Sequence, residues 1–144
     1  MSPPPTAAAL VLDTNVVLDW LVFRDASTQQ LEAALRSGVW RWHATTAMRT
    51  ELEHVLTYPA LADWNPRPDA VLAAWEAWVR PVRSESPSRG HPLRCTDPDD
   101  QMFIDLALQL GGCTLLSRDR AVLKLARRAR SFGLDILTPE RWTP

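Results

Sequence analysis

The sequence is poor in the residues that build disulfide frameworks and zinc sites. Its 144 residues include only two cysteines, Cys95 and Cys113, and three scattered histidines. Two cysteines are too few for a fold held together by disulfides, and none of these residues has the spacing of a zinc-binding motif. The sequence therefore argues against a disulfide-rich scaffold and a zinc protein. We expect these five side chains to be ordinary core or surface residues without a chemical role.

The chain also lacks a strong charge imbalance and a clean hydrophobic span. Its formal net charge is −1 at pH 7, so no overall field selects an acidic or a basic partner. The apolar stretch over residues 7–23 contains Asp13 and Asp19, which a bilayer interior disfavours. Residues 1–5 lack the basic start of a signal peptide. We therefore expect no membrane span and a cytoplasmic location.

What is present is the composition of an ordinary globular protein. Hydrophobic residues make up 46% of the chain, enough for a sizeable core, and the length suits one domain. We expect residues 1–6 to form a flexible tail and residues 7–144 to form a single domain. The basic residues are arginines except for Lys124. Arginine favours bidentate contacts with carboxylate or phosphate, although the base composition of the gene can produce the same bias.

Short apolar runs alternate with helical patterns along the chain. Strands are predicted at residues 7–13, 39–43, 113–116 and 134–137. Apolar residues at helical spacing predict helices at about residues 16–22, 28–37, 46–57, 70–79, 98–110 and 121–130. We expect Asp69 to cap the fourth of these helices and Trp75, by its helical spacing, to pack in the core. Residues 84–94, rich in serine, proline and arginine, are predicted to form a mobile surface loop. This alternation is typical of an α/β fold with a parallel central sheet.

Four acids stand apart from ordinary solvated charges because of where they fall. Asp13 ends the first predicted strand, and Asp119 follows the predicted strand at residues 113–116 across a short turn. If these strands are parallel neighbours, both carboxylates lie at the carboxyl edge of the sheet, where open α/β folds bind ligands. Glu51 lies on one predicted helix and Asp100 in the first turn of another. Both can point over the same edge.

Carboxylates that gather in this way repel one another, and each raises the pKa of its neighbours. Holding several of them ionised calls for a cation, and oxygen ligands without histidine or cysteine select hard ions such as Mg²⁺ or Mn²⁺. Such ions can promote phosphodiester hydrolysis. The alternative is that Asp97, Asp99, Asp100 and Asp119 cap helices, with Asp13 in a turn and Glu51 solvated.

The segments that carry these acids resemble the motifs of PIN-domain ribonucleases. Asp-Thr-Asn at residues 13–15 resembles the opening motif, and residues 50–59 resemble the acidic helix of the family. Residues 97–107 are similar to the third motif, residues 115–119 to the fourth, and residues 136–140 to the usual close. The motifs occur in the right order over nearly the whole chain after residue 6. The most similar subfamily supplies the toxins of bacterial toxin–antitoxin pairs.

The resemblance implies a three-layer α/β/α fold and a Mg²⁺- or Mn²⁺-dependent endoribonuclease. Such an enzyme hydrolyses single-stranded RNA and leaves a 5′-phosphate and a 3′-hydroxyl. By the same resemblance, Asp13, Glu51, Asp100 and Asp119 are the catalytic acids, and they act as metal ligands rather than as nucleophiles. An antitoxin protein is the implied partner.

Further positions in these motifs are expected to support the four acids. Asn15 and Ser117 match polar positions that orient the acids through hydrogen bonds, and Asp99 is assigned with them. Many relatives carry a second acid two residues beyond the last aspartate, where this chain has Ala121. An additional ligand at that position is therefore not expected.

The register of the third motif is open because three acids fall within four residues. Asp97 or Asp99 could take the place assigned to Asp100. We favour Asp100 because Phe103 and Ile104 then fall on the helix face expected behind it. Asp97, followed by proline, is also a good helix cap.

Basic residues follow the fourth motif closely and are candidate contacts for RNA. Arg118, Arg120 and Lys124 could each bind a backbone phosphate. The arginines of residues 127–130 either extend this surface or form a solvated helix face. Exposed aromatic surface on the early helices would suit an antitoxin segment or a second copy of the chain in a homodimer.

Two other functions are compatible with parts of the pattern. One is a catalytically weak PIN-fold module that binds RNA or protein. The other is a phosphatase of the haloacid dehalogenase type, which also places an aspartate after its first strand. That chemistry needs a second acid two residues later, and Asn15 stands there.

Overall fold

The computed structural model describes residues 7–84 and 93–144. Its centre is a five-stranded sheet with the order β3-β2-β1-β4-β5, in which every neighbouring pair is parallel. The strands are β1 (Ala8–Leu12), β2 (Trp40–Ala44), β3 (Val79–Pro81), β4 (Cys113–Leu116) and β5 (Asp135–Leu137). The predicted α/β class and parallel sheet are confirmed.

Helices connect these strands along the chain. The α-helices are α1 (Thr14–Leu21), α2 (Gln29–Ser37), α3 (Thr46–Val55), α4 (Pro68–Trp78), α5 (Gln101–Leu110), α6 (Arg120–Leu123) and α7 (Ala126–Ala129). Short 3₁₀ turns are η1 (Ala26–Thr28), η2 (Pro59–Trp64), η3 (Pro98–Asp100), η4 (Arg130–Phe132) and η5 (Pro139–Arg141). In the described part of the chain, no helix is long and apolar enough to cross a membrane.

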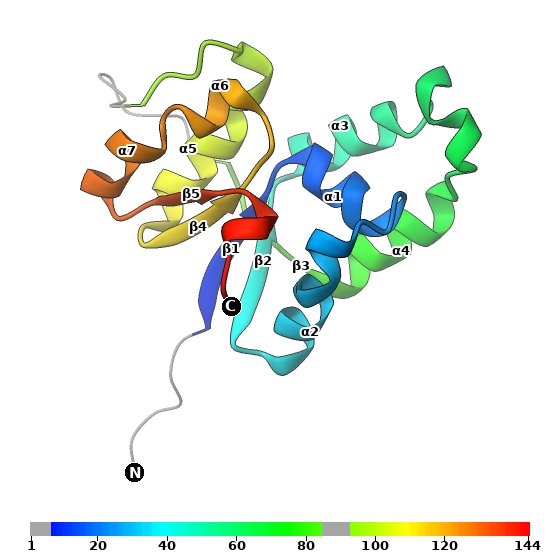
Figure 1. Ribbon diagram of the computed structural model, residues 1–144, viewed down its shortest axis with the longest axis horizontal. Helices are drawn as coiled ribbons and strands as arrows, with labels where there is room; N and C mark the ends of the chain where they lie inside the picture. Colours follow the sequence, from blue (N-terminus) through cyan, green and yellow to red (C-terminus); the bar gives the residue numbers. More distant parts are fainter. Residues whose placement is uncertain (1–6, 85–92) are drawn as a thin grey trace.

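The helices form two layers that flank the sheet, as predicted. Figure 1 shows α1 to α4 on the side of β2 and β3, and α5 to α7 on the side of β4 and β5. Helix α2 packs on β2, α5 on β1 and β4, and α7 on β5. The chain runs from β1 to β3 in one direction and then returns to β4 and β5. Right-handed crossovers therefore place the two groups of helices on opposite faces.

The core lies against the central strands. Leu10 and Val11 of β1 are fully buried, because the sheet is covered on both faces. Trp42 of β2 meets Trp20 and Trp75 edge-on, with ring centroids 5.8 and 5.0 Å apart. These tryptophans therefore pack in the core, as the helical spacing of Trp75 predicted.

Three local predictions were wrong. Val79 was assigned to a helix but begins β3, and Pro81 is tolerated there because β3 is an edge strand. Asp69 does not cap α4: Arg67 holds that position, and Asp69 lies in the first turn. The helix predicted at residues 121–130 is broken. The amide of Leu125 donates to the carbonyl of Val122, three residues back, and this tight turn separates α6 from α7.

Two further predictions fall largely outside the described residues. They are the tail at residues 1–6 and the greater part of the loop at residues 84–94. The assignment of residues 7–144 to one domain stays a prediction.

The path of the chain creates a switch point at the carboxyl edge of the sheet. After β1 the chain leads toward β2, whereas after β4 it leads toward β5 on the other side. The amide of Asp13 donates to the carbonyl of Leu116 at 3.0 Å and so joins the two strand ends. Open α/β sheets bind ligands in the crevice at such a point.

Candidate metal centre

Ser117 connects the acids at the ends of β1 and β4. Asp13 is only 4% exposed and Ser117 is completely buried. The Ser117 hydroxyl donates to Oδ2 of Asp13 at 2.6 Å, and it accepts the amide N–H of Asp119 at 3.0 Å. One hydroxyl therefore fixes both the Asp13 carboxylate and the backbone that carries Asp119.

Asp119 is a helix cap, as the alternative interpretation of the sequence proposed. Its Oδ1 accepts the amide N–H of Ala121 at 2.8 Å at the start of α6. This bond fixes the orientation of the carboxylate and engages only one of its two oxygens. Capping and ligand binding are therefore compatible at Asp119.

The turn before α5 brings two more aspartates to the same place. Carboxylate oxygens of Asp97, Asp100 and Asp119 all lie within 4.8 Å of one another. Asp97 caps η3 by accepting the amide N–H of Asp99 at 3.0 Å, while Asp99 itself is exposed. Asp100 is buried, with 8% exposure. The structure thus places Asp100 inside the cluster and Asp99 outside it, and it adds Asp97.

Gln101 holds the backbone that leads into this turn. Its side-chain oxygen accepts the amide N–H of Cys95 at 2.6 Å, and its side-chain nitrogen donates to the carbonyl of Leu93 at 2.9 Å. These bonds tie residues 93–95 to the first turn of α5. Hydrogen bonds therefore fix the backbone segment that precedes Asp97.

Glu51 enters from α3, on the other face of the sheet from α5. The Thr14 hydroxyl, in the first turn of α1, donates to the Glu51 carboxylate. The charge of Glu51 acts on Asp13 strongly enough to raise its pKa. The side-chain Oδ1 of Asn15 is buried and has no hydrogen-bond partner among the described residues.

The electrostatics of the cluster disfavour its charged state. Burial raises the pKa of Asp13 to about 6; the Ser117 hydrogen bond opposes this rise, and the charges of Glu51 and Asp119 add to it. Burial likewise raises the pKa of Asp100, together with hydrogen bonding to Asp119 and the charges of Asp13, Asp119 and Asp97. The buried Oδ2 of Asp100 has no hydrogen-bond partner among the described residues.

The donor set of this cluster suits a hard divalent cation. The acidic side chains that converge here offer carboxylate oxygens, which Mg²⁺ and Mn²⁺ prefer. In the described part of the chain, no arginine or lysine forms an ion pair with Asp13, Glu51, Asp100 or Asp119. A bound cation would satisfy the unpartnered Asp100 oxygen and oppose the mutual repulsion.

Comparison with known protein families decides the classification. The family model described as PIN domain matches residues 9–121, which hold all the acids named above. The chain belongs to the PIN-domain family.

A solved structure supports the fold of this PIN domain. A chain of VapBC2 from Rickettsia felis, crystallised bound to a DNA fragment from the promoter, superimposes with a TM-score of 0.60. The two chains are 12% identical, and the match covers 89% of this chain and 98% of the other. At this identity the likeness shows the shared fold alone. No curated protein matches the sequence.

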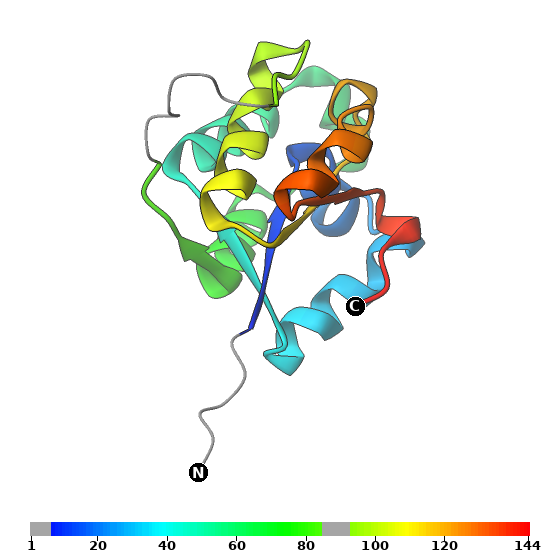
Figure 2. The same ribbon diagram turned by 90° about the vertical axis from the view of Figure 1, so that its left-hand side faces the viewer.

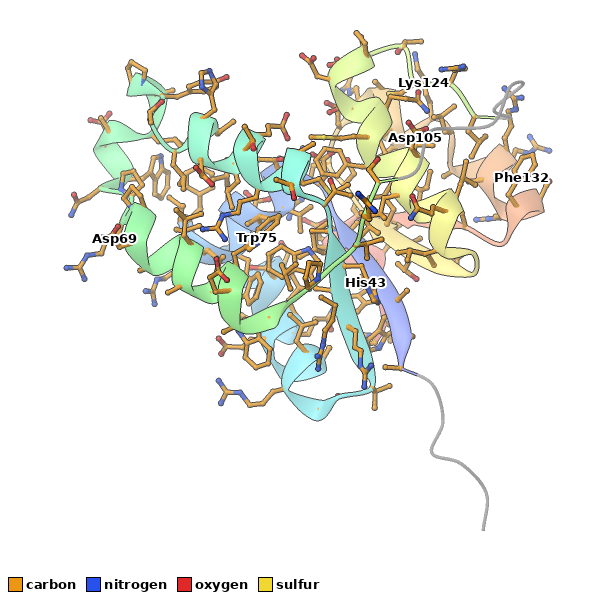
Figure 3. The ribbon with its side chains drawn as sticks, turned by 180° about the vertical axis from the view of Figure 1, so that it is seen from behind. His43, Asp69, Trp75, Asp105, Lys124 and Phe132 are labelled. Carbon is orange, nitrogen blue, oxygen red and sulfur yellow. The ribbon has the colours of Figure 1, made fainter. Side chains whose placement is uncertain are left out.

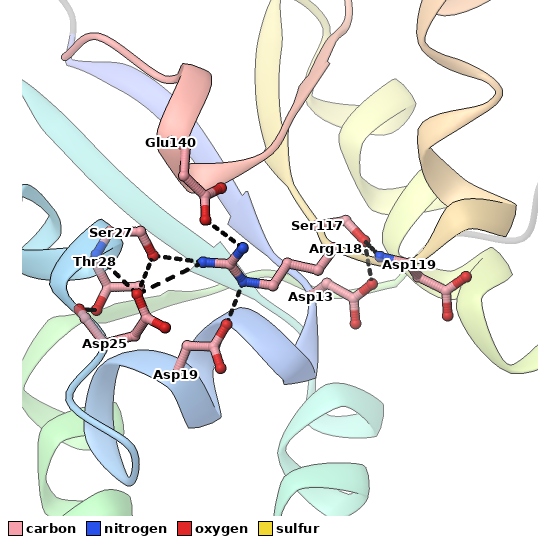
Figure 4. A network of polar contacts seen from close by, with 9 residues as sticks. All are labelled: Asp13, Asp19, Asp25, Ser27, Thr28, Ser117, Arg118, Asp119 and Glu140. Carbon is pink, nitrogen blue, oxygen red and sulfur yellow. Dashed lines mark hydrogen bonds and ion pairs between the residues drawn. The ribbon is translucent and has the colours of Figure 1, made fainter.

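The basic residues predicted to contact RNA lie in different surroundings in the PIN domain. Arg120 and Lys124 are exposed on and just after α6. Arg118 is half-buried, and its side chain points away from Asp13 and Asp119 (Figure 4). Its guanidinium bonds to Asp19 and Glu140 instead. The three side chains therefore do not form one surface.

Two features of the site were missed from the sequence. The bond from Thr14 to Glu51 joins residues 37 apart, and the placement of Thr14 in the opening motif was the available signal. The partners of Arg118 lie 99 and 22 positions away in Asp19 and Glu140. No local pattern marks such pairs, because they depend on how α1 and η5 pack around the strand ends.

Proposed function

We propose that this PIN domain is a metal-dependent endoribonuclease that hydrolyses phosphodiester bonds of single-stranded RNA. Asp13, Glu51, Asp100 and Asp119 would hold Mg²⁺ or Mn²⁺. The observation that carries the proposal is the convergence of buried and half-buried carboxylates, without a basic partner among the described residues, at the switch point of the sheet. When bound, a divalent ion supplies charge neutralisation at the phosphate and lowers the pKa of a nearby water.

The side chains of this domain have distinct parts in the proposed site. Ser117 and Thr14 orient the carboxylates of Asp13 and Glu51 through hydrogen bonds. Such bonds keep the acids in place before any ligand arrives, which lowers the cost of assembling the site.

Basic residues next to the cluster would hold the RNA backbone. Arg120 and Lys124 are exposed at α6, directly after Asp119. Each phosphate contact contributes affinity that falls as the salt concentration rises. Mutating either residue should therefore weaken RNA binding more at low salt than at high salt.

We further propose that the protein is the toxin of a toxin–antitoxin pair, bound by an antitoxin protein. The support is the resemblance of its motifs to that subfamily and the fold it shares with a chain of the VapBC2 complex. Co-expression with the product of a neighbouring small gene tests this: the antitoxin should co-purify and suppress cleavage.

Cleavage of a labelled single-stranded RNA by the purified protein tests the proposed activity. We expect cleavage with Mn²⁺ or Mg²⁺ and none with EDTA. Asp13→Asn and Asp100→Asn should each lower the rate by more than about 100-fold, since even residues that merely support a metal site often contribute 10- to 100-fold. Circular dichroism should show an unchanged fold.

Asp69→Asn is the matched control for these variants. It makes the same chemical change at an exposed residue of α4, on the opposite side of the molecule from Lys124 (Figure 3). Its rate should equal that of the unmodified protein. If the unmodified protein neither cleaves RNA nor binds Mn²⁺ by calorimetry, the domain is instead a binding module for RNA or protein.

A further inference from the structure

Arg118 stands between the two residues that organise the proposed site, yet its side chain lies outside it. Ser117 before it bonds to Asp13, and Asp119 after it belongs to the acidic cluster. We propose that Arg118 is a positioning residue that fixes this segment, not a phosphate contact. The inference rests on the proposed function for its catalytic consequence, while its structural consequence can be measured independently.

Each of the three nitrogens of the Arg118 guanidinium donates to a partner from a different segment. Nε donates to Asp19 on α1, Nη1 to Glu140 in η5, and Nη2 to the Ser27 hydroxyl in η1 (Figure 4). Asp25 lies 3.9 Å from Nη2. A planar group with donors on three nitrogens can hold all of these partners at once, whereas the single ammonium of a lysine cannot.

The partners of Arg118 are themselves held in place. The Ser27 hydroxyl donates to Asp25 at 2.6 Å, and the Asp25 carboxylate caps η1. The segment around η5 is tied to α2, because the Gln30 side chain donates to the carbonyl of Trp142 at 2.6 Å. Figure 2 shows this C-terminal segment beside α2. Arg118 is therefore anchored to fixed points.

The anchored segment is short, so the position of the Arg118 backbone determines the positions of Ser117 and Asp119 on either side of it. On one side of Arg118, the amide of Ser117 donates to the carbonyl of Leu137 at 3.0 Å. On the other side, the amide of Asp119 bonds to the Ser117 hydroxyl and its carboxylate caps α6. Arg118 adds a third restraint between these two. Its loss would let the Asp119 carboxylate drift from Asp100.

The charges around Arg118 argue against a role in binding RNA. Three carboxylates, from Asp19, Asp25 and Glu140, surround its one positive charge. A phosphate would have to displace these partners and would be repelled by them. This excess of negative charge suits an internal restraint better than an RNA contact.

Variants that remove Arg118 or one of its partners distinguish a positioning role from a role in binding RNA phosphates. Arg118→Gln and Asp19→Asn should both lower kcat, by about 10-fold or more, with KM nearly unchanged. The double variant should be no worse than the worse single variant, because both act through one contact. Arg118→Lys should not restore kcat. Arg49→Gln, which removes one ion pair within α3 and one between α3 and α4, is the control and should keep full activity.

Amide hydrogen exchange tests the structural part without any cleavage assay. In Arg118→Gln and Asp19→Asn, exchange at Asp119 and Ala121 should become about 10-fold faster or more. Exchange in β1 should not change. If the unmodified protein shows no ribonuclease activity, the proposed function fails while this measurement still decides whether Arg118 positions the segment.

Three results would overturn the proposal. The first is unchanged exchange at Asp119 in both variants. The second is an increase in KM for Arg118→Gln that Arg118→Lys restores, which identifies a phosphate contact. The third is stronger RNA binding with unchanged kcat in Asp19→Asn, as expected if the carboxylate merely competes with RNA. Should Arg118→Gln fail to fold, Asp19→Asn and Glu140→Gln decide the question through the same readouts.

Discussion

Two groups of three carboxylates lie next to the segment after β4, and they differ in how their charge is balanced. Asp19, Asp25 and Glu140 surround Arg118, which supplies a cation from the chain itself. Asp97, Asp100 and Asp119 gather within 4.8 Å of one another, and no described basic side chain pairs with them. Two neighbouring sites thus contain similar acids, but only one of them has a basic partner among the described residues.

The pKa values follow this difference. A hydrogen bond from Arg118 lowers the pKa of Glu140, and bonds from Ser27 lower the pKa of Asp25. Asp19 shows the limit of such compensation, since burial raises its pKa although Arg118 opposes the rise. In the acidic cluster, burial and like charges raise the pKa of Asp100, and no arginine of the described residues opposes them. Arg118 therefore makes the group of Asp19, Asp25 and Glu140 a structural contact between segments. The group of Asp97, Asp100 and Asp119 is suited to a metal ion instead.

The largest expected effect comes from supplying a cation to the acidic cluster. At pH 8, Mn²⁺ at about 100 times its dissociation constant should add roughly 2.7 kcal/mol to the free energy of unfolding. The melting temperature should rise by several degrees in a domain of this size. Thermal unfolding with and without Mn²⁺ measures this. An equal rise in Asp13→Asn and Asp100→Asn would show that the ion binds elsewhere.

The pH dependence of folding is the next largest effect. In the metal-free protein the pKa of Asp13 is about 6, above the value of 3.8 expected in an unfolded chain. Between these values the folded state binds more protons, so the free energy of unfolding falls as the pH rises from about 4 to about 6. The raised pKa of Asp100 extends the decline upward.

Urea denaturation in EDTA over this pH range measures that decline. Asp13→Asn should flatten it because an amide does not titrate. A loss of stability with rising pH that is as steep in Asp13→Asn as in the unmodified protein would contradict the assignment.

Removing the hydroxyl that connects the two strand ends should have an intermediate effect. Ser117→Ala takes away the bond to Asp13 and the acceptor for the Asp119 amide. We expect kcat for RNA cleavage to fall by about 10- to 100-fold. Ser37→Ala removes a hydroxyl that bonds to a backbone carbonyl in α2, and it should leave kcat unchanged. Equal rates in the two variants would argue against a role for Ser117.

The smallest effect concerns the two acids that precede Asp100. Asp97→Asn keeps an oxygen that can cap η3 but removes one charge from the cluster, so the Mn²⁺ affinity should fall by about 10-fold or less. Asp99→Asn changes an exposed side chain and should leave the affinity unaltered. Calorimetry measures both. A larger loss in Asp99→Asn than in Asp100→Asn would reverse the register of this motif.

The elements of the site were predictable where local patterns specify them. Asp13 ends one apolar run and Asp119 follows another across a short turn, and parallel strands bring such ends to one edge of a sheet. Asp100 was favoured over Asp99 because the apolar residues of α5 require it to face inward, and it is buried. Whether these acids bind a metal stays a prediction.

The parts that failed depend on tertiary contacts. Strand β3 is three residues long and ends in proline, so its sequence carries little strand signal, and among the described strands it pairs with β2 only. The orientation of the Arg118 side chain could likewise not be predicted from the sequence. An arginine beside a proposed catalytic acid suggests a substrate contact, and only the packing of α1 and η5 brings carboxylates to it.

The bond between Ser117 and Asp13 joins positions 104 residues apart in the chain. During synthesis, Asp13 leaves the ribosome long before the strand that completes its surroundings. The nascent protein therefore carries Asp13 without its Ser117 partner for most of its translation, and this bond can form only when β4 has inserted beside β1. A site assembled in this way would be complete only after the segment that follows β4 has been synthesised and has folded against β1.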